Sequence, residues 1–190
     1  MKRKTVIRLA LLGVLMVSLA LVAKFTPLGQ YFNFERLSST LSDAGPTGIV
    51  MFFVAFLAGA LMNLPAALFT AIAFLVYDIG WGFPIAYVGA FIAGYGHFLV
   101  VRTIGGQALG EIKIPLMQKI MARFDMHPLR TVILLRMLFF ISPPVNYLLA
   151  LSNVRLRHFV LGTLIGNIVQ IAFHATLMYF VRDWVLARLV

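Results

Sequence analysis

Apolar residues gather into five long stretches along the chain, and most charges lie in the segments between them. The stretches cover residues 9–23, 49–77, 83–101, 131–151 and 158–181. A helix of about 20 apolar residues crosses the roughly 30 Å hydrocarbon core of a bilayer. The pattern therefore predicts an all-α polytopic membrane protein.

The second and fourth stretches are interrupted near their midpoints, by Asn63-Leu64-Pro65 and by Ser142-Pro143-Pro144. Proline removes a backbone donor and clashes with the preceding turn, so each interruption ends a helix. The third and fifth stretches are continuous and predict plain spanning helices. The interrupted stretches are candidates for re-entrant hairpins, which enter and leave the membrane on one side.

Composition agrees with a membrane location. Of 190 residues, 62% are hydrophobic and 12% charged, whereas a soluble domain has about 45–50% and about 25%. The mean hydropathy is +0.97, which excludes soluble, disordered, fibrous and disulfide-stapled classes. Cysteine is absent, which excludes thiol catalysis and thiolate metal sites.

The net charge of +10 reports topology rather than nucleic-acid binding, because basic residues concentrate on the cytoplasmic side of membrane proteins. If all five stretches crossed, the basic segment 102–130 would lie outside. With two re-entrant hairpins, residues 2–8, 102–130 and 152–158 all lie in the cytoplasm. The charges therefore favour two opposed re-entrant helical hairpins in inverted-repeat halves, residues 49–101 and 131–181.

Interrupted segments at matching places in inverted halves indicate a substrate site near the bilayer midplane. Non-helical backbone at that depth must be buried in protein or line a water-filled cavity. We therefore expect a cavity between the hairpin tips. The chain divides into residues 1–48, a membrane domain over 49–181 and a short tail over 182–190.

The first apolar stretch follows basic residues at 2–8 and is closed by Lys24 without a convincing cleavage site. We interpret it as a retained transmembrane helix, with a signal peptide as the alternative. Both place the N-terminus in the cytoplasm. Residues 24–48 are then an external connector, with a short interfacial helix around residues 32–41.

The loop 102–130 contains an amphipathic pattern, in which Ile112, Leu116, Ile120 and Phe124 recur every four residues. Basic residues lie off that row. The pattern predicts a helix that lies on the cytoplasmic leaflet and binds anionic lipid, or one that packs under the bundle without a lipid role.

Arg136 lies within the fourth apolar stretch. Charged residues in membrane segments are rare and usually functional, so Arg136 is a candidate site residue. Its guanidinium suits a lipid phosphate or free hairpin carbonyls, and snorkelling to the interface is the alternative. Arg102 follows the third stretch directly. It either anchors that helix at the membrane interface or lies at the mouth of the cavity. Asn63 and Asn146, with Ser142, either cap the broken backbone or contact substrate.

The fifth stretch carries small and polar residues on one side, namely Gly162, Gly166, Asn167, Gln170 and His174. This stripe must face protein or water. His174 or His97 could relay protons, although interhelical hydrogen bonding is commoner.

Several enzymatic motifs are absent from the sequence: HExxH, GxSxG, a phosphate-binding GxxxxGK[ST] and a paired-carboxylate site in a membrane segment. We therefore expect no enzyme, no metal site and no cofactor.

Two sets of motifs resemble one known family. In the first half they are Asn63-Leu64-Pro65, Gly89-Ala90 through Gly94, and Arg102-Thr103-Ile104-Gly105-Gly106. In the second they are Leu135-Arg136, the segment from Ser142 to Tyr147, the segment from Asn153 to Phe159, and Gly162 to Gly166. Over about residues 45–181 the chain resembles the DedA superfamily, also called the VTT or SNARE-associated domain.

The resemblance implies a multi-pass protein of the bacterial inner membrane that moves lipids between leaflets, often with the proton-motive force. It implies functional roles for Arg136 and Arg102. Many members carry an acidic residue where this chain has Asn63, and Phe139 replaces a family proline. Passive scrambling is therefore favoured over coupling through a buried carboxylate, with Asp78 and His174 as the remaining candidates for coupling.

Our functional hypothesis is a flippase or scramblase of phosphate-bearing lipids, either phospholipid or polyprenyl phosphate. The expected substrate-binding residues are those around the two interruptions and the two arginines: Asn63, Pro65, Arg102, Arg136, Ser142, Pro143, Pro144 and Asn146. The alternatives are a membrane scaffold acting through the basic loop 102–130 and a proton- or ion-coupled antiporter. Membrane lipids are the expected partners, nucleic acid is not, and homo-oligomerisation is left open.

Overall fold

The computed structural model describes residues 3–25, 34–108, 122, 126–139 and 142–189. Helices make up the regular structure of this part of the chain, and it contains no strand. Their bounds are α1 Arg3–Phe25, α3 Phe34–Asp43, α4 Thr47–Leu61, α5 Ala66–Val76, α6 Asp78–Gly105, α8 Pro128–Phe139, α9 Pro143–Leu151 and α10 Leu156–Leu189. The short helix expected around residues 32–41 is present as α3.

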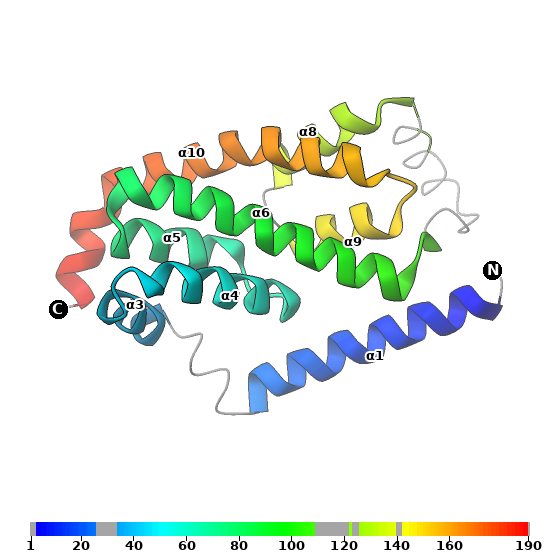
Figure 1. Ribbon diagram of the computed structural model, residues 1–190, viewed down its shortest axis with the longest axis horizontal. Helices are drawn as coiled ribbons and strands as arrows, with labels where there is room; N and C mark the ends of the chain where they lie inside the picture. The colour runs from blue at the N-terminus through cyan, green and yellow to red at the C-terminus, as the bar shows by residue number, and fades with distance from the viewer. Residues whose placement is uncertain (1–2, 26–33, 109–121, 123–125, 140–141, 190) are drawn as a thin grey trace.

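The two longest helices, α6 and α10, lie side by side and run in opposite directions (Figure 1). Residues Asp78–Gly105 and Leu156–Val181 are long and apolar enough to cross a membrane. This confirms, by length and composition, the two continuous stretches that the sequence assigned to spanning helices.

Both helices extend beyond their predicted ends. Residues 78–82, which separate the second and third predicted apolar stretches, form the start of α6, and residues 182–189, which we expected in a tail, continue α10. Glycine discourages helix formation, yet Gly82 packs where a Cβ would lie 2.6 Å from the carbonyl oxygen of Ala73. Close packing of α6 on α5 therefore outweighs local propensity.

The chain turns back between α4 and α5. Near the turn, the rings of Phe56 and Phe69 stack with centroids 4.6 Å apart. At the other end, Tyr77, which follows α5, packs edge-on against Phe52 of α4 with ring centroids 6.4 Å apart. At about 1.5 Å per residue, the 15 residues of α4 and 11 of α5 measure about 22 and 16 Å, so neither helix is long enough to span alone.

A second pair of short helices, α8 and α9, is joined to the opposite end of α6. Leu151, at the end of α9, lies against Gly105, at the end of α6. The first pair instead leads directly into the start of α6 through Tyr77. The two helical hairpins therefore open toward opposite ends of α6, as Figure 1 shows. Their position relative to a bilayer stays a prediction.

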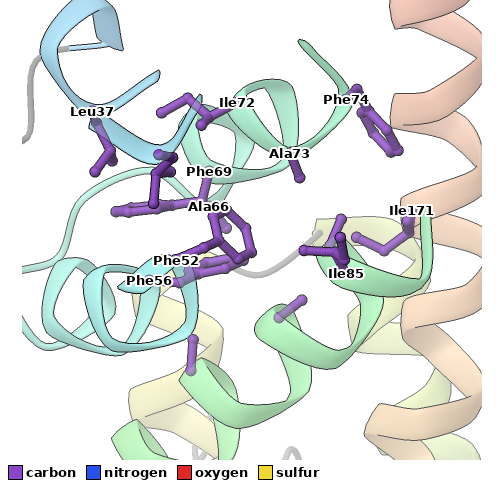
Figure 2. Packing of buried hydrophobic residues seen from close by; sticks show 14 of the residues in the cluster. Leu37, Phe52, Phe56, Ala66, Phe69, Ile72, Ala73, Phe74, Ile85 and Ile171 are labelled. Atoms are coloured by element: carbon purple, nitrogen blue, oxygen red, sulfur yellow. The ribbon is translucent and has the colours of Figure 1, made fainter. Parts of the chain in front are cut away.

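Buried apolar side chains form two separate clusters. The first joins α3, α4 and α5 to the beginning of α6 and the later part of α10 (Figure 2). The second joins α1, α8 and α9 to the end of α6 and the beginning of α10. Along α10 the clusters are separated by residues 161–170, where Thr163, Asn167 and Gln170 are buried. These three buried polar residues of α10 therefore lie between the two apolar clusters.

The amphipathic helix predicted over residues 112–124 falls almost entirely outside the described residues. That prediction and the lipid role attached to it stay untested.

Candidate functional site

Arg136 is the largest fully buried side chain of the described residues, with an exposed fraction of 0%. Its Nη1 donates to Oδ1 of Asn146 at 2.6 Å, and its Nε donates to Oγ1 of Thr163 at 3.4 Å. The guanidinium also lies 5.4 Å from the ring centroid of Phe159. Arg136 therefore points into the protein rather than snorkelling to an interface.

The interruption in the second half presents Asn146 to this arginine. Pro143 and Pro144 occupy the first positions of α9, where a missing N–H costs nothing and the fixed φ suits the helix. Ser142 is extended, and its carbonyl accepts a hydrogen bond from the backbone N–H of Asn146 at 3.1 Å. The proline pair thus starts α9 one turn before Asn146, which places that amide at the guanidinium.

Glycines make room for the arginine on two neighbouring helices. A Cβ at Gly166 of α10 would lie 2.5 Å from Cβ of Arg136. A Cβ at Gly94 of α6 would lie 3.6 Å from its Nη2, an ordinary contact distance. Gly166 is therefore required for the close approach of α8 to α10, whereas Gly94 lies beside the charged end of the side chain.

Asn63 links the first hairpin to the second. It lies just past the end of α4 with φ of +62°, a left-handed conformation that asparagine tolerates better than most residues. Its N–H donates to the carbonyl of Ala60, and that of Leu64 donates to Gly59, which closes the helix in a Schellman motif. The backbone therefore performs the capping, and the side chain is free for another contact.

That contact is with α9, the short helix that carries Asn146. The hydroxyl of Tyr147 donates to Oδ1 of Asn63 at 3.0 Å. The ring of Tyr147 also meets the ring of His97 edge-on, with centroids 4.7 Å apart. Asn63 of the first interruption, Tyr147 of α9 and His97 of α6 thus meet at one place.

On α6, α8 and α10, several buried polar atoms have no hydrogen-bond partner among the described residues. They are Nη2 of Arg136, both ring nitrogens of His97, and both side-chain polar atoms of Asn167 and of Gln170. Within the described residues no carboxylate pairs with Arg136. Buried polar groups almost always have a partner, so this region is suited to hold water or a polar ligand, and its charge favours an anion.

Comparison with protein families matches residues 45–180 to the VTT domain, the DedA or SNARE-associated domain. The chain belongs to the VTT-domain family. The match covers both hairpins, α6 and most of α10, so the family assignment predicted from the motifs is confirmed. Comparison with curated proteins and with solved structures gave no match.

Arg102 of the VTT domain faces the far end of α9. Its Nη2 donates to the carbonyls of Leu149 at 3.2 Å and Val154 at 3.0 Å, and its Nε donates to the carbonyl of Ala150. A cation at the C-terminal end of a helix stabilises the free carbonyls and the helix dipole. In this conformation Arg102 therefore holds α9 in position, and a role in substrate binding stays a prediction.

The remaining predicted residues lie apart from the guanidinium. Nδ1 of His174 is 3.0 Å from Oγ1 of Thr70, an interhelical hydrogen bond between α10 and α5. Asp78 is exposed at the start of α6, with φ of +60°. Pro65 is exposed at the end of the first interruption. Their predicted functional roles are not tested by these positions.

A pocket of about 840 Å³ lies between α8 and α9 of the VTT domain. Its wall is mostly apolar and includes Leu134, Leu138 and Leu148, with Ser142 and Pro144 among the lining residues. Arg136 and Asn146 do not line it. The pocket thus lies within one hairpin, whereas we expected a cavity between the two hairpin tips.

Two partners of the site were not among the predicted site residues, although both lie within the family motifs. Tyr147 and Thr163 bind Asn63 and Arg136, but neither was singled out from the sequence. Spacing offered a signal for Thr163, because it lies four residues before Asn167 on the polar stripe. Tyr147 offered no such signal, since its partner is distant in the sequence.

Proposed function

We propose that this VTT-domain protein moves phosphate-bearing lipids between the two leaflets of the bacterial inner membrane. The observation that carries the proposal is the buried guanidinium of Arg136, which has a free Nη2 and no acidic partner among the described residues. An isolated charge in a membrane segment costs several kcal/mol. A lipid phosphate would supply the missing negative charge.

The guanidinium is suited to a phosphate, because its planar donors match two phosphate oxygens. Asn146 holds Nη1 and Thr163 holds Nε, so the orientation of the guanidinium is fixed while Nη2 stays available. The lipid tail remains in an apolar environment, part of which is the apolar pocket between α8 and α9. Polar protein groups therefore solvate the phosphate head group, and apolar protein groups contact the lipid tail.

In the proposed topology, the hairpins α4–α5 and α8–α9 re-enter the membrane from opposite sides. Each helix in them is too short to span, and the pairs open toward opposite ends of α6. The basic residues at 2–8 and 155–157 then face the cytoplasm, together with the N-terminus. The buried polar region lies near the middle of the bilayer.

Reconstituted vesicles provide the test. The purified protein is placed in liposomes that contain a phospholipid with a fluorescent head group, and a membrane-impermeant quencher measures its exposure on the outer leaflet. We expect wild-type protein to speed the exchange between leaflets, and Arg136→Gln to slow it at least about tenfold, which corresponds to about 1.4 kcal/mol.

Arg155→Gln is the matched control, because Arg155 is an exposed arginine of the same half. This variant should transport at the wild-type rate. Exchange by wild-type protein at the rate of empty liposomes would refute the proposal. Equal loss in the Arg136 and Arg155 variants would also refute it, since general surface charge would then explain the effect.

A further inference from the structure

One face of α10 carries a continuous polar row: Thr163, Asn167, Gln170 and His174. The spacing of four, three and four residues places all of them on the same side of the helix. From Thr163 to His174 the row measures about 16 Å along the helix axis, at about 1.5 Å per residue. It therefore connects Arg136 of the second half, bonded to Thr163, with Thr70 of the first half, bonded to His174.

The two ends of this polar row have protein partners, whereas its middle has none among the described residues. Thr163 accepts from Nε of Arg136 at 3.4 Å, and His174 is bonded to Thr70 at 3.0 Å. Asn167 and Gln170 are 0% and 1% exposed, and neither amide has a partner in the described structure. The middle of the row thus requires water or a ligand, because unpaired buried polar groups are strongly unfavourable.

The neighbouring helix α6 adds to the row. His97 is buried, and neither of its ring nitrogens has a hydrogen-bond partner in the part of the chain that the structure describes. It lies near Arg136 and Tyr147, so it extends the unpaired groups from the free Nη2 of the arginine. The other side of α10 is apolar and exposed, including Ile165, Ile168 and Val169. The polar row is therefore an internal feature, and the opposite side of the helix suits contact with lipid.

We infer that this polar row of α10 is a hydrated track along which the phosphate-bearing head group moves between Arg136 and His174. The inference rests on the proposed function, and adds a path to the phosphate site at Arg136. Amide and imidazole groups offer hydrogen bonds to phosphate oxygens. The row contains no carboxylate that would repel an anion, and only Arg136 at one end would hold it strongly.

The hydration of the polar row can be measured by the accessibility of single cysteines, an assay that does not depend on transport. The native chain has no cysteine, so Asn167→Cys, Gln170→Cys and Ile168→Cys each carry a single thiol. The probe is an anionic, membrane-impermeant methanethiosulfonate, which reacts with the thiolate and thus reports a site that water reaches. We expect modification at 167 and 170 at least about tenfold faster than at 168, which faces outward one residue away.

The thiols of denatured protein provide the control, since all three should then react equally. Equal rates at the three positions in folded protein would overturn the inference, as would failure of both 167 and 170 to react. If one of these variants does not fold, the other decides the result.

Apolar replacements of similar shape separate a transport role from a structural one. Removing unpaired polar groups should leave the thermal midpoint unchanged or raise it, so Asn167→Leu and Gln170→Met should fold at least as stably as wild type. We expect both to transport at least about tenfold more slowly in the vesicle assay. Ile168→Leu, on the outward side, should transport normally.

Lower thermal midpoints would show that the amides stabilise the fold through protein partners, which would overturn the inference. Wild-type transport by the apolar variants would also overturn it, while loss only in Arg136→Gln would leave the proposed function standing. If wild-type protein transports no lipid, the proposed function fails and with it the assignment of the track to lipid.

Discussion

The bond between Arg136 and Asn146 allows the energetics of the site to be measured directly. Nη1 and Oδ1 are 2.6 Å apart, and the two side chains are 0% and 3% exposed. Arg136→Met leaves Oδ1 of Asn146 without its donor, at a cost of about 1–3 kcal/mol. Asn146→Leu removes a hydrogen-bond acceptor from the buried charge, at a cost of about 1.5–3 kcal/mol.

The double variant removes the bond and both polar groups together. Replacing both partners by apolar groups of similar shape is nearly neutral in favourable cases. We therefore expect the double variant to be more stable than the sum of the single effects implies, by about 1.5–3 kcal/mol. Transport should be lost in the double variant even where its stability recovers.

The assay is reversible denaturation in mixed micelles of mild detergent and dodecyl sulfate, followed by circular dichroism. A matched cycle with Arg155→Met and Asn153→Leu, both at exposed positions, should give additive effects within about 0.5 kcal/mol. Additivity within the same margin at Arg136 and Asn146 would refute the bond. Normal transport by the double variant would refute the role of the guanidinium.

Three further predictions concern the surroundings of the site. Gly166→Ala should lower the thermal midpoint in detergent and slow transport, because its Cβ would lie 2.5 Å from Cβ of Arg136. Gly94→Ala should lower the midpoint far less, because its Cβ would lie 3.6 Å from Nη2 of Arg136. Equal effects of the two variants would contradict the packing. Asn63→Val should be less stable than Asn63→Gly by about 1–2 kcal/mol in the same denaturation assay, since valine is strained at positive φ; equal stability would show that the left-handed turn is absent. Arg102→Met should lower the free energy of unfolding by about 2 kcal/mol, because its bonds at the end of α9 are lost. Arg102→Lys should retain part of this stabilisation. An unchanged midpoint for Arg102→Met would show that α9 is held by other contacts.

The sequence alone determined the class of the protein, the places where its helices break and its family. Long apolar stretches indicate a membrane protein, because a segment with so few charges is stable mainly in the hydrocarbon core of a bilayer. The breaks at Asn63-Leu64-Pro65 and at Ser142-Pro143-Pro144 were visible because proline acts on its own backbone and on the residue before it. Arg136 and Asn146 could be selected for a similar reason, since each is unusual for its local surroundings.

Only the tertiary structure decided which of these groups meet. Asn63 and Tyr147 come from opposite halves, and no local rule relates their positions. Arg102 could be identified as an interface residue, but its bonds to the end of α9 depend on how two distant helices pack. The start of α6 at Asp78 likewise depended on the close contact of Gly82 with α5.

The polar row of α10 shows the division most clearly. Periodicity placed Gln170 and His174 on one side of a helix, and the sequence required that side to face protein or water. It could not distinguish His174, which has a partner in α5, from Gln170, which has none among the described residues. That difference depends on the neighbours that the fold supplies, because hydrogen bonding is satisfied between segments and not within the pattern of one helix.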